Sequence, residues 1–189
     1  ALMRQAQSVK KGVKQSGGTP REFCTITVTD GIAMGHEGMK SSLISREVIA
    51  DSAELTVRGH CYDALVGIAG CDKSLPGLMM SMLRLNVPSV FIYGGSILPG
   101  KFKGKDVTVV DVFEAVGKHS SGKMSSEELR ELELVACPSA GACGGQFTAN
   151  TMACVSEAIG LALPYSAGTP APYEERDKYA KESGKTVMN

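Results

Sequence analysis

Two short runs of almost uninterrupted apolar residues most constrain the fold of this chain. Residues 63–69 (DALVGIA) and 88–93 (PSVFIY) are each followed by a glycine-containing turn. Runs of this length and character are typical of parallel strands that are buried on both faces. Helical patterns precede and separate them at residues 43–58 and 77–85. This alternation predicts an α/β fold, with a parallel sheet flanked by helices on both faces in a three-layer arrangement.

The remaining segments predict further elements of the same kind. Ser125, followed three residues later by Glu128, has the spacing of a helix-capping box. A strand is expected at residues 22–29, which are rich in β-branched side chains, and a loop at residues 94–106. Helices are expected at residues 1–16, 109–118, 125–136 and 146–162, and a polar helix near residue 189.

The overall composition excludes several classes of protein. The 189 residues suit one domain, and their formal net charge of zero argues against a nucleic-acid partner. No apolar run reaches the roughly 18–20 residues that a membrane span needs, and no signal peptide is visible. The six cysteines are irregularly spaced, and a chain with this much apolar sequence needs no disulfides, so we expect reduced thiols.

Reactive side chains follow two of the predicted strands. Asp30 comes directly after the first, and Cys71, Asp72 and Lys73 come after the second. Since ligands of open α/β sheets bind at the carboxyl ends of strands, we expect these residues in one pocket. Carboxylate oxygens suit Mg²⁺, although each aspartate is equally a candidate for a helix cap or a turn. A thiol beside a lysine at a helix start favours the thiolate, and the alternative for Cys71 is a small buried side chain.

A second cysteine-bearing turn lies at residues 136–145. Cys143 is followed by Gly144 and Gly145, whose backbone amides are open at the start of a predicted helix, a favourable place for a thiolate or a cluster sulfide. Cys143, rather than Cys137, is therefore expected to face the pocket. The absence of a CxxC pair argues against structural zinc, and no glycine segment fits a nucleotide-binding motif. Three cysteines fall within predicted regular elements and are expected to be packing residues: Cys24, Cys61 and Cys154.

Three segments together resemble the signatures of one family, the dihydroxy-acid and sugar-acid dehydratases. They are residues 29–39 (TDGIAMGHEGM), 70–77 (GCDKSLPG) and 137–152 (CPSAGACGGQFTANTM). The resemblance extends over nearly the whole chain. The GHEGM version of the first signature is most similar to the enzymes of branched-chain amino-acid (isoleucine and valine) biosynthesis.

The resemblance implies roles for particular residues. Cys71 and Cys143 match ligands of an iron–sulfur cluster, of either the 2Fe–2S or the 4Fe–4S type. Asp30 and Asp72 match Mg²⁺ ligands, and Lys73 matches a lysine that is carbamylated and supplies a further Mg²⁺ oxygen. Alternatively, Lys73 stays a cation that pairs with Asp72 or with a substrate carboxylate. In the family, a third cluster cysteine lies in an Asn-Pro-Cys-Asn-like segment that would precede residue 1. A further Mg²⁺ carboxylate and a serine base lie in a C-terminal domain, so residues 1–189 are expected to form an incomplete N-terminal domain.

The reaction that the resemblance implies is dehydration of a 2,3-dihydroxy acid to a 2-keto acid, with a sugar acid as the alternative substrate. Two hypotheses from other classes are a redox iron–sulfur module and a catalytically silent binding domain. We expect a homodimer of the full-length enzyme without nucleic-acid or membrane partners. The expected compartment is the cytoplasm, or the mitochondrial or plastid matrix in a eukaryote.

Overall fold

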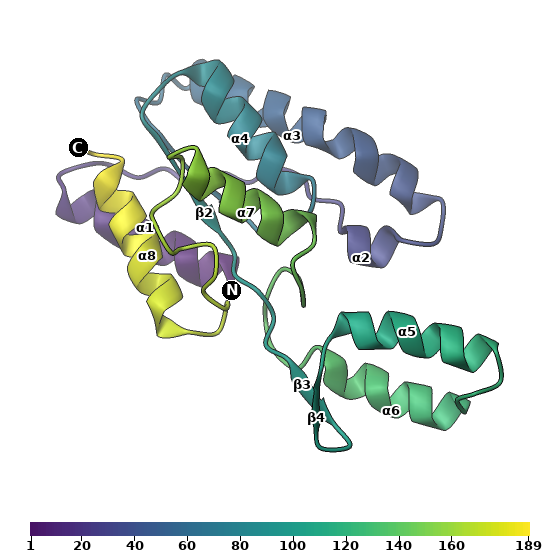
Figure 1. Cartoon of the computed structure of the whole chain (residues 1–189). Coiled ribbons are helices and arrows are strands. Elements are labelled where there is room, and N and C mark those ends of the chain that lie inside the picture. The colour runs from purple at the N-terminus through teal and green to yellow at the C-terminus, as the bar shows by residue number, and fades with distance from the viewer.

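The computed structural model describes residues 1–189 and shows a mixed α/β protein with eight helices and two small sheets (Figure 1). No helix is both long and apolar enough to cross a membrane. The elements in chain order are α1 (Leu2–Gln15), α2 (Asp30–Ala33), α3 (Gly38–Gly59), β1 (Leu65–Ala69), α4 (Ser74–Leu85), β2 (Ser89–Tyr93), β3 (Gly100–Phe102), β4 (Lys105–Val107), α5 (Val109–Ser120), α6 (Ser126–Ala136), α7 (Thr148–Ala158) and α8 (Glu174–Thr186).

The central sheet consists of β1 and β2, which pair in parallel with Leu65 opposite Ser89. Helix α4 makes the crossover that a parallel pair requires. An isolated parallel bridge between Phe91 and Ala162 continues the sheet beyond β2. The predicted α/β class and parallel pairing are confirmed. The extended three-layer sheet that we expected is not seen, because only two strands pair.

Helices contact both faces of this small sheet. Leu65 and Ala69 point into the main core, which α3, α4 and α7 complete. Val66 and Ile68 point to the opposite face, where α1 and α8 lie. This alternation follows from the two-residue period of a strand, and it explains why the strand sequence is apolar throughout.

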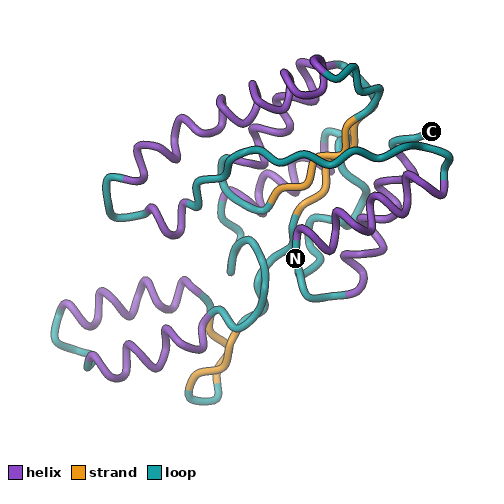
Figure 2. The backbone as a smooth tube through the Cα atoms, turned by 180° about the vertical axis from the view of Figure 1, so that it is seen from behind, coloured by secondary structure: helices purple, strands orange, loops and turns teal.

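Helices α1 and α8, from opposite ends of the chain, lie side by side (Figures 1 and 2). Glycines permit their close approach. A Cβ built on Gly12 would lie 2.0 Å from the carbonyl oxygen of Lys181, and one on Gly184 would lie 2.2 Å from that of Val9. No side chain fits at either position, so this helix pair depends on both glycines.

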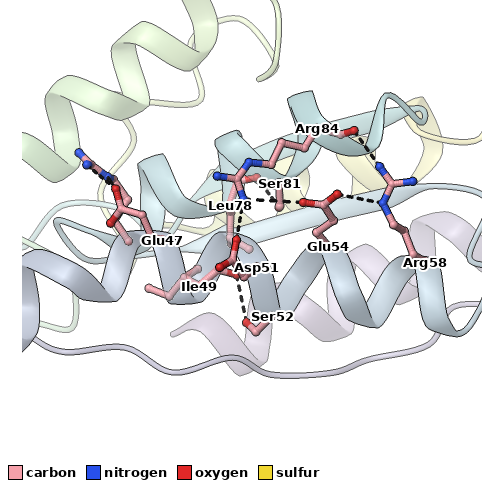
Figure 3. Close-up of polar contacts among 10 residues, drawn as sticks. Glu47, Ile49, Asp51, Ser52, Glu54, Arg58, Leu78, Ser81 and Arg84 are labelled. Atoms are coloured by element: carbon pink, nitrogen blue, oxygen red, sulfur yellow. Dashed lines mark hydrogen bonds and ion pairs between the residues drawn. The ribbon is translucent and has the colours of Figure 1, made fainter.

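Helices α3 and α4 form a second close pair, whose polar edge is drawn in Figure 3. Arg84 of α4 pairs with Asp51 at 2.7 Å and with Glu54 at 3.7 Å, while Arg58 binds Glu54 at 2.9 Å. Each of these pairs has at least one partner that is 40% or more exposed, so the pairs add little stability. The close approach of the two helices depends on Gly77, where a Cβ would lie 2.8 Å from the Arg46 carbonyl oxygen of α3.

A separate lobe contains the β3–β4 hairpin with α5 and α6, and it projects from the rest of the chain (Figure 1). The hairpin occupies part of residues 94–106, which we expected to be a loop. Only the serine half of the capping box predicted for α6 is confirmed: the Ser125 hydroxyl accepts the Glu128 N–H at 3.1 Å, without a return bond from the Glu128 side chain. A full capping box occurs instead at α5, between Thr108 and Asp111.

The predicted strand at residues 22–29 is wrong. This segment is an extended chain that joins α1 to α2, and residues 22–28 make no backbone–backbone hydrogen bond. Its β-branched composition favours an extended conformation, but a strand also needs a hydrogen-bonded neighbour, and none lies beside it here.

Candidate functional site

Asp30 is the first residue of α2, at the end of the extended segment. The Thr29 carbonyl accepts the N–H groups of Ile32 and Ala33, which starts the short helix and turns the Asp30 side chain inward. As a whole residue, backbone included, Asp30 is only 8% exposed. The hydroxyl of Ser42, which is fully buried on α3, donates to its Oδ1 atom. The backbone and α3 together therefore fix the orientation of this carboxylate.

Cys71, Asp72 and Lys73 form the turn between the end of β1 and the start of α4. The Ser74 hydroxyl holds this turn, since it accepts the Cys71 N–H at 3.1 Å and donates to the Cys71 carbonyl at 2.8 Å. The turn thereby presents three chemically reactive side chains at the carboxyl end of a buried strand, as the sequence suggested.

Lys73 joins the two aspartates. Its Nζ atom lies 2.9 Å from Asp30 Oδ2 and also pairs with Asp72 Oδ2. All three side chains are largely buried: that of Lys73 is 14% exposed, that of Asp30 12% and that of Asp72 19%. Two carboxylates thus converge on one cation in a largely buried place, where water solvates none of the charges fully.

The environment of this triad shifts the pKa of two of its members. Burial opposes the charged form of Lys73, but hydrogen bonds to Asp72 and Asp30 outweigh it and raise the pKa of the amine above its usual value. Burial likewise opposes ionisation of Asp72, but hydrogen bonding with Lys73 and Thr148 prevails and lowers its pKa. Both shifts favour the charged forms of Lys73 and Asp72.

Cys143 is held beside this turn by the loop that follows β2. The Ala142 N–H donates to the Gly95 carbonyl at 2.8 Å, and the Ile97 N–H donates to the Cys143 carbonyl at 2.9 Å. Close contact is possible because residue 141 is glycine, where a Cβ would lie 2.5 Å from the Ile97 nitrogen. Two distant segments of sequence thus meet at the carboxyl end of the sheet.

The Cys143 thiol is half-buried, and burial is the main cause that raises its pKa. The N–H groups of Gly145 and Gly144 act in the opposite direction by hydrogen bonding to the sulfur, and electrostatic repulsion from Cys71 and Asp72 adds to the increase. The Cys143 segment lies close to the Cys71 turn, since a Cβ built on Gly70 would lie 3.5 Å from the Cβ of Ala142. A polar cavity of about 330 Å³ opens beside Gly144 and Gly145.

The other cysteines differ from Cys71 and Cys143, which are only partly exposed. Cys137 is exposed, and all six thiols are free. Cys24, Cys61 and Cys154 are also exposed, so the expectation that they pack in the interior is wrong. Cys24 lies on the extended segment rather than on a strand, and Cys61 lies in the turn after α3.

The donor set fits a magnesium ion only when Lys73 is included. No three His, Cys, Asp or Glu side chains converge on one point. Asp30 and Asp72 do converge, on the position that the Lys73 ammonium fills. A carbamate on Lys73 would replace that cation by an anionic oxygen donor and leave three oxygen ligands around a place that needs a cation. For an iron–sulfur cluster the chain offers two thiols, Cys71 and Cys143, which is a partial ligand set.

Sequence reasoning missed two of the residues that orient the site, Ser42 and Ser74. Ser42 gave no signal, because its role depends on how α3 packs over α2. Thr148 was a candidate from the sequence, because it lies at the start of the helix that follows Gly144 and Gly145, with a cap or surface role as the alternative; the structure places it in hydrogen-bonding reach of Asp72. Ser74 could have been recognised, since a serine three residues after Cys71 is well placed to bond back to the turn.

Comparison with known proteins places the chain in a family. Residues 1–189 match the family described as "Dihydroxy-acid/6-phosphogluconate dehydratase N-terminal". The chain is 93% identical over 189 residues to a dihydroxy-acid dehydratase of Pelagibacter ubique and 84% identical to one of Parvibaculum lavamentivorans. It is 57% identical over 187 residues to a dihydroxy-acid dehydratase of the archaeon Metallosphaera sedula. The aligned region covers all or nearly all of this chain but only 33%, 33% and 34% of these relatives.

The three signatures that carry the candidate site therefore lie within one family match that spans the chain. On this evidence the chain belongs to the dihydroxy-acid/6-phosphogluconate dehydratase family, and it corresponds to the N-terminal third of the relatives.

Proposed function

We propose that the full-length protein is a hydro-lyase that converts a 2,3-dihydroxy carboxylic acid into a 2-keto acid. The observation that carries the proposal is the convergence of the Asp30 and Asp72 carboxylates on Lys73, with Cys71 on the same turn and Cys143 beside it. The names of the relatives support the reaction class. Isoleucine and valine biosynthesis is the pathway that we propose from the first signature.

Asp30, Asp72 and a carbamylated Lys73 would hold Mg²⁺, and Cys71 with Cys143 would hold an iron–sulfur cluster whose remaining ligand lies outside this chain. When bound, these groups supply Lewis acids, Mg²⁺ for the substrate carboxylate and 2-hydroxyl and an iron for the 3-hydroxyl. The overall change removes the proton from carbon 2, breaks the bond from carbon 3 to its hydroxyl, and gives an enol that tautomerises to the keto acid.

The protein's own residues would prepare the site for this change. Ser42 fixes the Asp30 carboxylate, and Ser74 fixes the turn that carries Asp72 and Lys73. Lys73 must lose a proton before its amine adds CO₂, and its two carboxylate partners oppose that loss. A carbamate on Lys73 would leave three negative groups together, which a bound cation would neutralise. A cation, in turn, would be repelled by the Lys73 ammonium, which carbamate formation would remove. Carbamate formation and cation binding should therefore favour each other.

Two competing functions are less well supported by the site. Electron transfer by an iron–sulfur cluster does not require carboxylates next to the cluster ligands. Here Asp72 directly follows Cys71 in the chain, which argues against a redox module. A silent binding domain has no use for the Lys73 triad. A sugar acid remains the alternative substrate, because the family description also includes 6-phosphogluconate dehydratase.

We also propose that the full-length protein is a homodimer of the cytoplasm, or of an organelle matrix in a eukaryote.

The test is a keto-acid assay on the full-length protein, purified without oxygen and supplied with Mg²⁺. We expect a branched 2,3-dihydroxy acid to be dehydrated faster than an aldonic acid or 6-phosphogluconate. Asp72→Asn should abolish turnover, whereas Asp63→Asn, outside the site, should not. Faster turnover of the sugar acids would assign the protein to the alternative, and no turnover of any of them would refute the proposal.

A further inference from the structure

A long groove opens beside β1, on the side away from β2. Its volume is about 1090 Å³, and most of the residues that line it are hydrophobic. One wall is β1, and the other is the extended segment that precedes Asp30. Figure 2 shows this segment as a long loop that runs past the strands. Side chains of α1 and α4 line the groove between these walls.

The β1 wall is an unpaired strand edge. The Leu65 N–H donates to the Pro88 carbonyl at 3.0 Å, and the Ala69 carbonyl accepts the Gly94 N–H at 2.7 Å. Since the backbone groups of successive strand residues point to alternate sides, Val66 and Ile68 direct theirs into the groove. No other strand pairs with β1, so these groups have no ladder partner.

The opposite wall is also unpaired. Residues 22–28 are extended and β-branched, and they make no backbone–backbone hydrogen bond. Of their backbone groups, only the Val28 carbonyl receives a hydrogen bond from a side chain, from Cys71 Sγ at 3.8 Å. Two extended backbones thus line one apolar groove, each with free donors and acceptors, although proteins normally pair or cover such edges.

The other edge of the sheet is already used. The Phe91 N–H of β2 donates to the Leu161 carbonyl at 2.7 Å, and the parallel bridge to Ala162 lies next to this bond. The groove is therefore the place where the central sheet can still grow. A strand there would have side chains of α1 on one face and of α4 on the other, as a buried strand requires.

We propose that an extended apolar segment of the full-length protein, from outside residues 1–189, lies in this groove as a β-strand between residues 22–29 and β1. The chain supplies only 33% of the length of its relatives from Pelagibacter and Parvibaculum, so ample sequence exists to provide it. About five residues, or roughly 17 Å of strand, would match β1. The insertion would pair both walls and convert residues 22–29 into the strand that their sequence favours. It would also widen the small central sheet between the helices that cover its two faces. The proposal does not depend on the catalytic function.

Hydrogen–deuterium exchange of the full-length protein at single-residue resolution tests this directly. The internal control is Gly67, whose N–H points to β2. We expect the amides of Val66 and Ile68 to exchange as slowly as that of Gly67, and amides within residues 23–28 to be protected as well. Exchange of Val66 and Ile68 about 100-fold faster than Gly67 would overturn the proposal, because that is the behaviour of an open or merely covered edge.

Two further measurements separate other occupants. A second copy of the chain in the groove would make the protection of Val66 and Ile68 fall on dilution to monomer, which also contradicts the proposal. Val66→Pro removes the N–H that faces the groove, whereas Val66→Ala keeps it. Proline is tolerated at an open edge but not in a central strand. We expect Val66→Pro to lose folded full-length protein and Val66→Ala to retain it, and equal yields would count against strand insertion.

Discussion

Replacement of Lys73 by methionine should destabilise the metal-free protein far more than loss of a surface ion pair. Its ammonium lies 2.9 Å from one Asp30 oxygen and also binds Asp72, and all three side chains are at most 19% exposed. At an effective dielectric constant of about 20, one such contact corresponds to roughly 6 kcal/mol of Coulomb energy. Desolvation offsets much of this attraction, and removal of one partner from a buried pair typically costs about 3–5 kcal/mol. We expect a loss of about 3 kcal/mol or more for Lys73→Met, because two carboxylates are left without a cation.

The assay is denaturant unfolding of the full-length protein in excess chelator, followed by circular dichroism. Lys40→Met is the matched control, since its pair with Glu37 is 77% and 86% exposed and should contribute at most about 1 kcal/mol. A double variant, Lys73→Met with Asp30→Asn, should recover part of the loss because it removes one of the two stranded charges. The reasoning fails if Lys73→Met costs no more than Lys40→Met.

Three further predictions follow from the packing and the site. Cys143→Ser should lower the iron content of anaerobically purified full-length protein, whereas Cys137→Ser should leave it unchanged; equal iron loss in both would reverse the assignment of these cysteines. Gly184→Ala should push α1 away from α8 and lower the melting temperature, since its Cβ would lie 2.2 Å from the Val9 carbonyl oxygen. Gly117→Ala is the control and should be neutral or slightly stabilising, because the space around its Cβ is open. Similar melting temperatures for the two variants would contradict this packing. Burial, with the nearby Cys143 thiolate, raises the pKa of Tyr93 to about 12, above its usual 10. The contribution of the neutral Tyr93 hydroxyl to the free energy of unfolding is therefore complete below pH 10 and lost as the pH rises toward 12. Wild type should lose more stability than Tyr93→Phe over that range. Parallel pH profiles of the two proteins would count against this prediction.

The sequence predicted best those elements whose pattern and environment agree. The apolar run that contains β1 and the serine cap of α6 were both identifiable, because local preference and final packing coincide there. Residues 22–29 failed because extended preference alone does not supply a neighbouring strand. The β3–β4 hairpin was hidden by strands of only three residues, although Gly104, with φ of 78°, marks its turn.

The site was predictable only in part for a similar reason. The position of Asp30 and Asp72 after apolar or β-branched runs suggested that they would lie together, and they do share Lys73. The buried Ser42, by contrast, contacts Asp30 through the packing of α3 over α2, which has no local signature. The exposed cysteines show the same limit, since residue type alone did not reveal which side of each element would be covered.

The most direct test of the proposed site is the dehydratase activity of full-length Lys73→Arg, measured with a branched 2,3-dihydroxy acid and excess Mg²⁺. Arginine keeps the positive charge that Asp30 and Asp72 share, but its pKa is too high for it to form a carbamate. We predict loss of turnover with iron content and fold unchanged, because the third Mg²⁺ oxygen would be missing. Turnover equal to that of wild type would show that residue 73 acts only as a cation and would contradict the proposed Mg²⁺ site.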